Sequence, residues 1–226
     1  MIAALLLAAA AATPAHKAPA KAPVMTAVDA ELAFARDAKK IGQWSAFRKW
    51  VDNDAVMFTP KAVWASTFLK TLKDPPNAIS WRPAHSFVSC DGRTAVNTGP
   101  WFRQDGTLAG YFTTVWQRTP HGWRWAYDGG GPAAAGEKAP TGAPKIHRGS
   151  CKTTAPGAPI APPPPLTAKQ ARETPEDNGD GQSADKTLGW DWKVEKDGSR
   201  KFRVYQWKGG MYAQVLYNDV PAPKPQ

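Results

Sequence analysis

Few side chains in this sequence combine acid–base chemistry with an expected place inside a fold. Histidine titrates nearest to neutral pH, and His85 is expected on a strand, within the run "ISWRPAHSFVS". His16, His121 and His147 fall in a tail, a turn and a linker, so their spacing suggests no metal cluster. We take His85 as the candidate general base and expect no metal site.

Other reactive residue types occur in patterns that favour structural roles. Asp52 and Asp54 form "DND" before an apolar run, which is typical of a turn. Ser86 directly follows His85, and neighbours on a strand point to opposite faces of a sheet. Neither pattern therefore predicts a carboxylate pair or an activated nucleophile.

One acidic stretch, "EDNGDGQSADKT" over 176–187, partly matches a calcium-binding loop. Glu176, Asn178, Asp180 and Gly181 take matching positions, but the bidentate Glu at the twelfth position is missing. We interpret this stretch as a flexible acidic loop. No cofactor motif is recognised, and no cofactor is expected.

Helix signals dominate the chain from residue 26 to residue 76. Thr26 and Asp29 form a capping box, and Gly42 gives a stop signal for this first helix. A second helix follows to about residue 51, the apolar run over 55–58 favours a buried strand, and residues 64–72 show helical spacing. Three helices and one strand should therefore lie at the start of the fold.

Beyond residue 76 the apolar period changes to two, which indicates strands. Four short runs are separated by "CDG", "QDG" and "PHG", as in an antiparallel meander. Residues 132–187 form a Pro/Ala-rich linker with the acidic loop, and 188–220 contain three further strand-like runs. The predicted domains are a tail (1–25), an α+β domain (26–131), this linker, a small three-stranded antiparallel sheet (188–220) and a short tail (221–226).

Taken together, "DNDAVMFTP" (52–60), "SWRP" (80–83), "NTGPW" (97–101) and "GYFTTVWQRTPHGWRWAYDGG" (110–130) resemble the nuclear transport factor 2-like superfamily, nearest its SnoaL-like branch. The resemblance implies a bent antiparallel sheet wrapped around three helices as a cone, often with an apolar pocket and often dimeric. It also implies a base beside a hydrogen-bond donor if the cone is catalytic, and Tyr127 is then the candidate donor.

Hairpin register assigns side chains to the two faces of the meander. Opposed residues share a face, so "PHG" and "QDG" as turns place Trp116 opposite Trp125 and Gly99 opposite Phe112. The same register puts Asp128 on the other face, away from any pocket. The expected ligand-binding face comprises Asn97, Gly99, Trp101, Phe112, Thr114, Trp116, Trp125 and Tyr127.

The N-terminal run and the two cysteines point to export. Residues 2–12 are apolar and precede small residues, which is typical of a signal peptide, with a periplasmic destination and no transmembrane segment in the mature chain. In an oxidising compartment Cys90 and Cys151 would form a disulfide. The net charge of +10 is scattered among acidic residues, so we expect no nucleic acid partner.

These patterns leave three functions open. The leading hypothesis is an exported cone that binds a small apolar or aromatic molecule, or acts as an interaction module, without catalysis. One alternative is a general acid–base enzyme using His85 and Tyr127, and another is an envelope-associated structural protein. A homodimer formed through the sheet is a further expected partnership.

Overall fold

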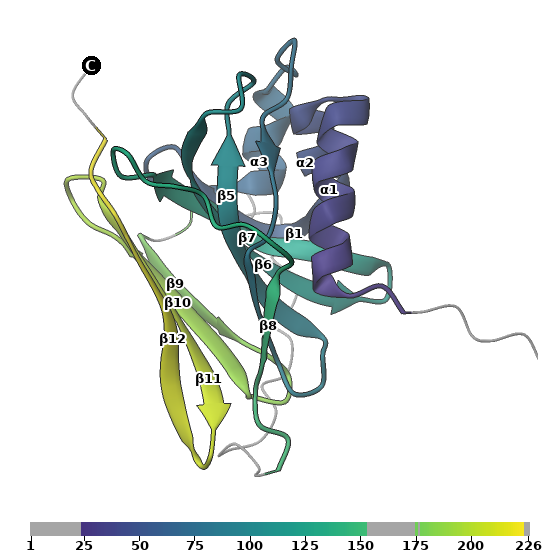
Figure 1. The fold of residues 1–226 in the computed structure, drawn as a ribbon, viewed down its shortest axis with the longest axis vertical. Helices are drawn as coiled ribbons and strands as arrows, with labels where there is room; N and C mark the ends of the chain where they lie inside the picture. The colour runs from purple at the N-terminus through teal and green to yellow at the C-terminus, as the bar shows by residue number, and fades with distance from the viewer. Residues whose placement is uncertain (1–23, 153–174, 176, 224–226) are drawn as a thin grey trace, which may run out of the picture.

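The protein is an α+β structure in which helices pack on one face of a large sheet and a second sheet packs on the other (Figure 1). The computed structural model describes residues 24–152, 175 and 177–223. The apolar run of the predicted signal peptide and residues 153–174 of the Pro/Ala-rich linker therefore lie outside the described residues. No helix in the described ranges is long and apolar enough to cross a membrane.

Three α-helices lie in the N-terminal part of the fold, as predicted, and the third follows the first two strands of the large sheet. Thr26 caps the first helix, and its side chain and that of Asp29 form the expected capping box. Gly42 ends this helix at a φ of 102°, a backbone conformation that favours glycine. The helical segments are α1 (Ala27–Ile41), α2 (Gln43–Trp50), α3 (Ala65–Phe68) and a 3₁₀ turn (Leu69–Thr71).

The large sheet contains the predicted meander, extended at both edges. Its strand order is β2-β1-β7-β6-β5-β4-β8, with β3 paired to β5. The central pairs are antiparallel, but β1 pairs with β7 and β4 pairs with β8 in parallel, so the sheet is mixed. The strands are β1 (Val51–Phe58), β2 (Ala62–Trp64), β3 (Ser80–Trp81), β4 (His85–Val88), β5 (Thr94–Phe102), β6 (Leu108–Thr119), β7 (Gly122–Pro132) and β8 (Lys145–Arg148).

The C-terminal sheet has four strands in the described chain, one more than predicted. Its order is β12-β11-β10-β9, and the extra edge strand β9 comes from the stretch interpreted as a flexible acidic loop. Asn178 and Asp180 of the partial calcium motif pair in it with Lys193 and Asp191. The linker prediction likewise missed β8. The strands are β9 (Asn178–Gln182), β10 (Leu188–Val194), β11 (Arg200–Lys208) and β12 (Met211–Val220).

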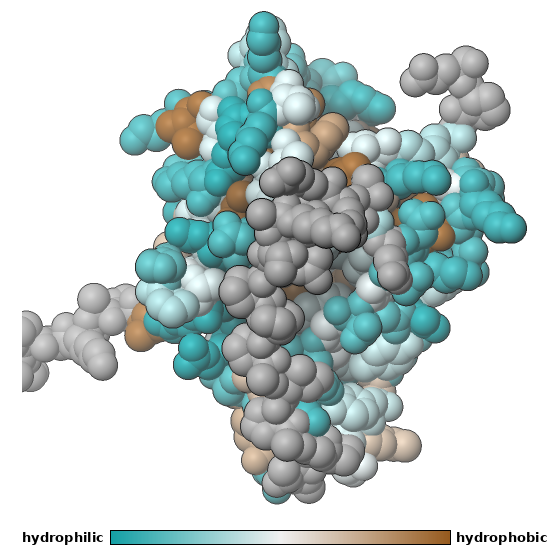
Figure 2. Space-filling view, turned by 180° about the vertical axis from the view of Figure 1, so that it is seen from behind, coloured by the Kyte–Doolittle hydropathy of each residue, from teal (hydrophilic) through white to brown (hydrophobic). Residues whose placement is uncertain are grey.

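Two apolar cores hold these layers together. The inner core joins α1 and α2 to the large sheet and is rich in aromatic rings, with Phe34 and Trp116 almost fully buried. The outer core joins the opposite face of that sheet, including Val96 and Val115, to the C-terminal sheet. The outer face is thus already covered, while pairing of two copies through the sheet stays a prediction. The face seen in Figure 2 is mostly hydrophilic, with small separate apolar patches.

Polar contacts also fix the C-terminal sheet to the large sheet. The buried Gln206 amide donates hydrogen bonds to the carbonyls of Val88 (3.1 Å) and His147 (2.8 Å). The predicted disulfide between Cys90 and Cys151 is present, with a Cα–Cα distance of 5.2 Å. These links hold the end of β8 beside β4, at the edge of the large sheet.

Candidate functional site

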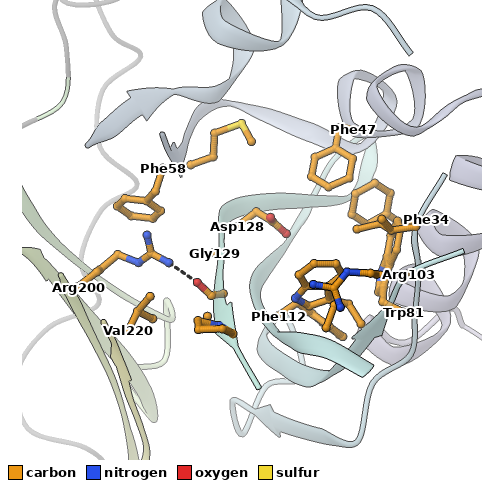
Figure 3. Close-up of a pocket in the computed structure, with 17 residues that line it drawn as sticks. Phe34, Phe47, Phe58, Trp81, Arg103, Phe112, Asp128, Gly129, Arg200 and Val220 are labelled. Carbon is orange, nitrogen blue, oxygen red and sulfur yellow. Dashed lines mark hydrogen bonds between the residues drawn. The ribbon is translucent and has the colours of Figure 1, made fainter. Parts of the chain in front are cut away.

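A cavity of about 510 Å³ lies between the helices, the inner face of the large sheet and the edge of the C-terminal sheet (Figure 3). This volume is within the usual range of small-molecule sites. Its lining residues are Phe34, Phe47, Met57, Phe58, Ile79, Trp81, Trp101, Arg103, Ala109, Phe112, Asp128, Gly129, Gly130, Gly131, Pro132, Arg200 and Val220. The aromatic face is therefore partly hollow.

A β-bulge brings a carboxyl group into this cavity. Val115 pairs with Tyr127 and Trp116 with Trp125, so Ala126 is an extra residue on β7. Beyond a bulge the side-chain alternation is inverted. The predicted register, which placed Thr114 and Tyr127 on the same inner face, is therefore wrong beyond the bulge, and Thr114 lies opposite Asp128 instead.

Asp128 is the chemically distinctive residue of the cavity. The Thr114 hydroxyl donates a 2.9 Å hydrogen bond to Asp128 Oδ2, and Figure 3 shows the carboxyl pointing away from Arg200. Burial raises the pKa of Asp128 to about 7, although the Thr114 hydrogen bond and the positive charge of Arg200 both oppose the shift. A carboxyl group with this pKa exchanges protons readily near neutral pH.

A second carboxyl group, Glu31 of α1, lies behind the cavity wall. Its oxygens accept hydrogen bonds from the indole nitrogens of Trp81 (2.8 Å) and Trp116 (2.6 Å), and from Asn97 Nδ2 (3.3 Å). Burial raises the pKa of Glu31 to about 7 against these three donors, and the nearby charge of Asp128 adds to the effect. Glu31 thus links α1 to β3, β5 and β6.

The predicted ligand-binding residues separate into three groups. Trp101 and Phe112 line the cavity, and Thr114 donates a hydrogen bond to the carboxyl group of Asp128 in it. Asn97, Trp116 and Trp125 lie on the predicted inner face but are buried in the core, where Asn97 and Trp116 bond to Glu31. Their expected contact with a ligand therefore stays a prediction.

Tyr127 lies on the outer face of the sheet, contrary to the sequence prediction. Its ring packs against Phe58 and Phe202, with centroids 5.3 and 4.4 Å away. Burial raises the pKa of its hydroxyl well above the ordinary value. The bulge at Ala126 accounts for the wrong face, and Tyr127 is not part of the cavity wall.

His85 also lies away from the aromatic cavity. Its Nδ1 is 3.1 Å from His147 Nε2 on β8, and the two rings stack. Burial and the neighbouring His85 lower the pKa of His147. His85 instead lines a second hollow, of about 300 Å³, with Tyr111 and Glu137, so the structure does not bring His85 and Tyr127 together in one site.

Two functional candidates, Asp128 and Glu31, were missed for different reasons. The register argument assigned Asp128 to the wrong face because alternation alone does not reveal a bulge. Glu31 could have been found, since it is a charged residue on the buried side of α1, beside Ala27, Ala30 and Phe34. Burying a carboxyl group costs free energy, so a glutamate within the apolar stripe of a helix indicates a specific structural or functional role.

Comparisons with known proteins add little to this geometry. No protein-family profile matches the sequence, and no curated protein matches it. Two solved structures are similar over 47% of this chain. One, from Novosphingobium aromaticivorans, is provisionally assigned as an aromatic ring hydroxylase (15% identity, TM-score 0.34, 85% of that chain). The other, from Streptomyces avermitilis, is provisionally assigned as a dehydratase of the NTF2-like family (16%, TM-score 0.28, 93%).

Proposed function

We propose that this protein is an exported, nuclear transport factor 2-like cone, nearest the SnoaL-like branch, that binds a small aromatic or apolar molecule. The observation that carries the proposal is the 510 Å³ cavity with its aromatic lining. Apolar surface buried from water supplies affinity, and the few polar groups orient the bound molecule. The disulfide is consistent with an oxidising compartment such as the periplasm.

A screen of compounds with one or two rings, both neutral and anionic, tests this function. Trp81 and Trp101 line the cavity, so a bound ring should change tryptophan fluorescence, and a ligand specific to the native state should raise the Tm. Ala109→Leu places a larger side chain in the cavity wall and should weaken binding. Ala213→Leu, on β12, is the matched control and should bind normally.

Absence of any binding by the wild type across this screen would reject the cavity as a ligand site. Equal affinities for wild type and Ala109→Leu would place the binding elsewhere. Both variants need native near-UV circular dichroism before their affinities are compared, because overpacking a core costs about 1–3 kcal/mol.

A second candidate function is proton transfer at carbon, with Asp128 as the base. The specific observation is a carboxyl group with a pKa near 7, held by Thr114 inside an apolar cavity. As a base, the ionised carboxylate would take a proton from a carbon adjacent to a carbonyl group of the bound molecule and return it at another position. Transfer needs the ionised form, so the rate should rise with pH through about 7.

Hydrogen exchange into a bound ketone tests the proton-transfer function. In D₂O, wild type should accelerate deuterium exchange at the carbon next to the carbonyl of 2-tetralone, measured by NMR. Asp128→Asn should bind the ketone but lose the acceleration. Exchange that persists in Asp128→Asn, or that is lost equally in His85→Ala, would reject Asp128 as the base.

A further inference from the structure

We propose that Arg200 binds an anionic group of the cavity's ligand, so that the ligand class is a small aromatic or alicyclic carboxylate. This inference rests on the proposed ligand-binding function and names the class of molecule bound. The residue comes from β11 of the C-terminal sheet, which thereby contributes to the site as well as covering the outer face of the large sheet.

Arg200 is a buried charge that interacts with the Tyr127 hydroxyl and the Asp128 carboxyl but has no ion pair at close range among the described residues. It is 6% exposed, and no carboxylate within the described ranges forms an ion pair with it. A charge removed from water is costly unless it is paired and hydrogen-bonded. The carboxyl of Asp128 shares the cavity, but it points away from the guanidinium (Figure 3).

The guanidinium is nevertheless held in a defined position. Its Nη2 donates a 2.7 Å hydrogen bond to the carbonyl oxygen of Gly130, and its carbon lies 4.0 Å from the centre of the Phe58 ring. A cation over an aromatic face is stabilised by the ring's quadrupole. These two contacts orient a planar group that suits a carboxylate, as Figure 3 shows for the side chain beside Phe58 and Val220.

The hydrogen-bonding capacity of Arg200 is not used up by these contacts. The guanidinium has five N–H donors, and Nε is buried without a partner among the described residues. An anionic oxygen entering the cavity would neutralise the charge and supply acceptors for the remaining donors after a small shift of the side chain. The rest of the ligand would lie toward Trp101 and Phe112 on the apolar wall.

A purely structural role for Arg200 leads to a different expectation. The bond to Gly130 also fastens β11 to β7, so its loss should lower stability whichever ligand the cavity binds. Stability alone therefore does not separate the two roles. Discrimination between a carboxylate and its neutral amide does, because both ligands have the same shape and only the carboxylate needs the guanidinium.

The test compares matched ligand pairs by calorimetry at pH 6. The pairs are benzoate with benzamide and 2-naphthoate with 2-naphthamide. Wild type should bind the better carboxylate at least tenfold more tightly than its amide, and 1 M NaCl should reduce that preference. Arg200→Gln should bind both members of the pair equally. Arg200→Lys keeps the positive charge but cannot form two parallel hydrogen bonds to a carboxylate, so it should show an intermediate preference.

One arginine outside the cavity provides a control, and a second arginine in the cavity wall provides a rival anion partner. Arg203→Gln lies on the same strand, where Arg203 pairs with Asp191 on an exposed surface, and should retain the full preference. Arg103→Gln tests the rival partner, because it removes the other guanidinium that lines the cavity; the proposal requires the preference to depend on Arg200 instead. If Arg103→Gln lost the preference and Arg200→Gln kept it, the anion would bind Arg103 and the proposal would be overturned.

The possible outcomes separate this proposal from the one on which it rests. If wild type binds the neutral amides as tightly as the carboxylates, the cavity function survives and the role of Arg200 is rejected. If neither member of any pair binds, both proposals fail. If Arg200→Gln does not fold, Arg200→Lys and the wild-type salt dependence decide, and an unchanged preference under both conditions counts against Arg200.

Discussion

Thr114 and Asp128 face each other across β6 and β7, joined by a 2.9 Å hydrogen bond inside the cavity. The extra residue Ala126 creates this relationship by turning Tyr127 outward and Asp128 inward. One inserted residue in β7 thus places the carboxyl group of Asp128, instead of the phenol of Tyr127, on the inner face of the large sheet. Because Asp128 lines the cavity, the affinity of the cavity for an anionic ligand should depend on pH.

Asp128→Asn should change how the affinity for 2-naphthoate depends on pH. In wild type the affinity should fall as pH rises through about 7, because ionised Asp128 repels an anionic ligand. A fall of about tenfold corresponds to about 1.4 kcal/mol of repulsion. The variant should lose most of this fall, which calorimetry between pH 6 and pH 8 measures.

Other charges facing Asp128 limit the size of the effect. The charge of Arg200 lowers the pKa of Asp128, burial keeps the Tyr127 hydroxyl neutral, and Glu31 ionises near the same pH behind the wall. Part of the decline should therefore remain in Asp128→Asn. The neutral 2-naphthamide is the control ligand, and a decline of equal size for both ligands would refute electrostatic repulsion as its cause.

Glu31→Gln should alter the pH dependence of folding stability. The folded pKa of Glu31 is about 7 and its ordinary value is 4.5, so the folded state retains the proton over this interval. Stability from this group is present below the unfolded pKa and is lost as pH rises through 7, by about 1.4 kcal/mol per pH unit. Denaturant unfolding measured at several pH values between 5 and 7 should show that the unfolding free energy falls less steeply with pH in the variant than in wild type.

The same variant should be less stable than wild type at pH 5, by about 1–3 kcal/mol, since an amide nitrogen accepts no hydrogen bond from Trp81 or Trp116. Asp37→Asn is the control on the same helix. Contacts with Lys49 and Trp50 lower the pKa of Asp37, so its titration lies below this pH range. It should keep the wild-type slope, whereas identical slopes in all three proteins would exclude a titrating Glu31.

Gly99→Ala should destabilise the fold by about 2–3 kcal/mol. The predicted pairing of Gly99 with Phe112 is confirmed. A Cβ on Gly99 would overlap the carbonyl oxygen of Arg82, whose backbone N–H is hydrogen-bonded to Pro100 of β5. Gly189→Ala is the control, because its Cβ would meet atoms no closer than 3.7 Å, and should change the unfolding free energy by less than about 0.5 kcal/mol.

Local signals account for the parts of the fold that the sequence predicted well. The capping box at Thr26, the stop at Gly42 and the pairing of Trp116 with Trp125 each depend on residues close in the chain. Aromatic alternation also located the cavity face through Trp101 and Phe112. These features need no knowledge of distant contacts.

The missed features depend on tertiary packing. β9 is polar and glycine-rich, and it becomes a strand because Trp190 and Trp192 of β10 pack where Cβ atoms on Gly179 and Gly181 would lie. Arg200 enters the cavity only because the C-terminal sheet docks on the large sheet. Neither event has a signal in the local residue pattern.

Reduction of the Cys90–Cys151 disulfide should lower the unfolding free energy by about 3–5 kcal/mol. The two residues are 61 positions apart, so the bond removes much of the unfolded chain's conformational freedom. Unfolding in urea with and without dithiothreitol measures the loss. The double variant Cys90→Ser/Cys151→Ser should match the reduced wild type and be insensitive to dithiothreitol.

Neither cysteine lines the cavity, so the affinity for 2-naphthoate should hardly change. Equal stability of oxidised and reduced wild type would contradict a structural role for this disulfide.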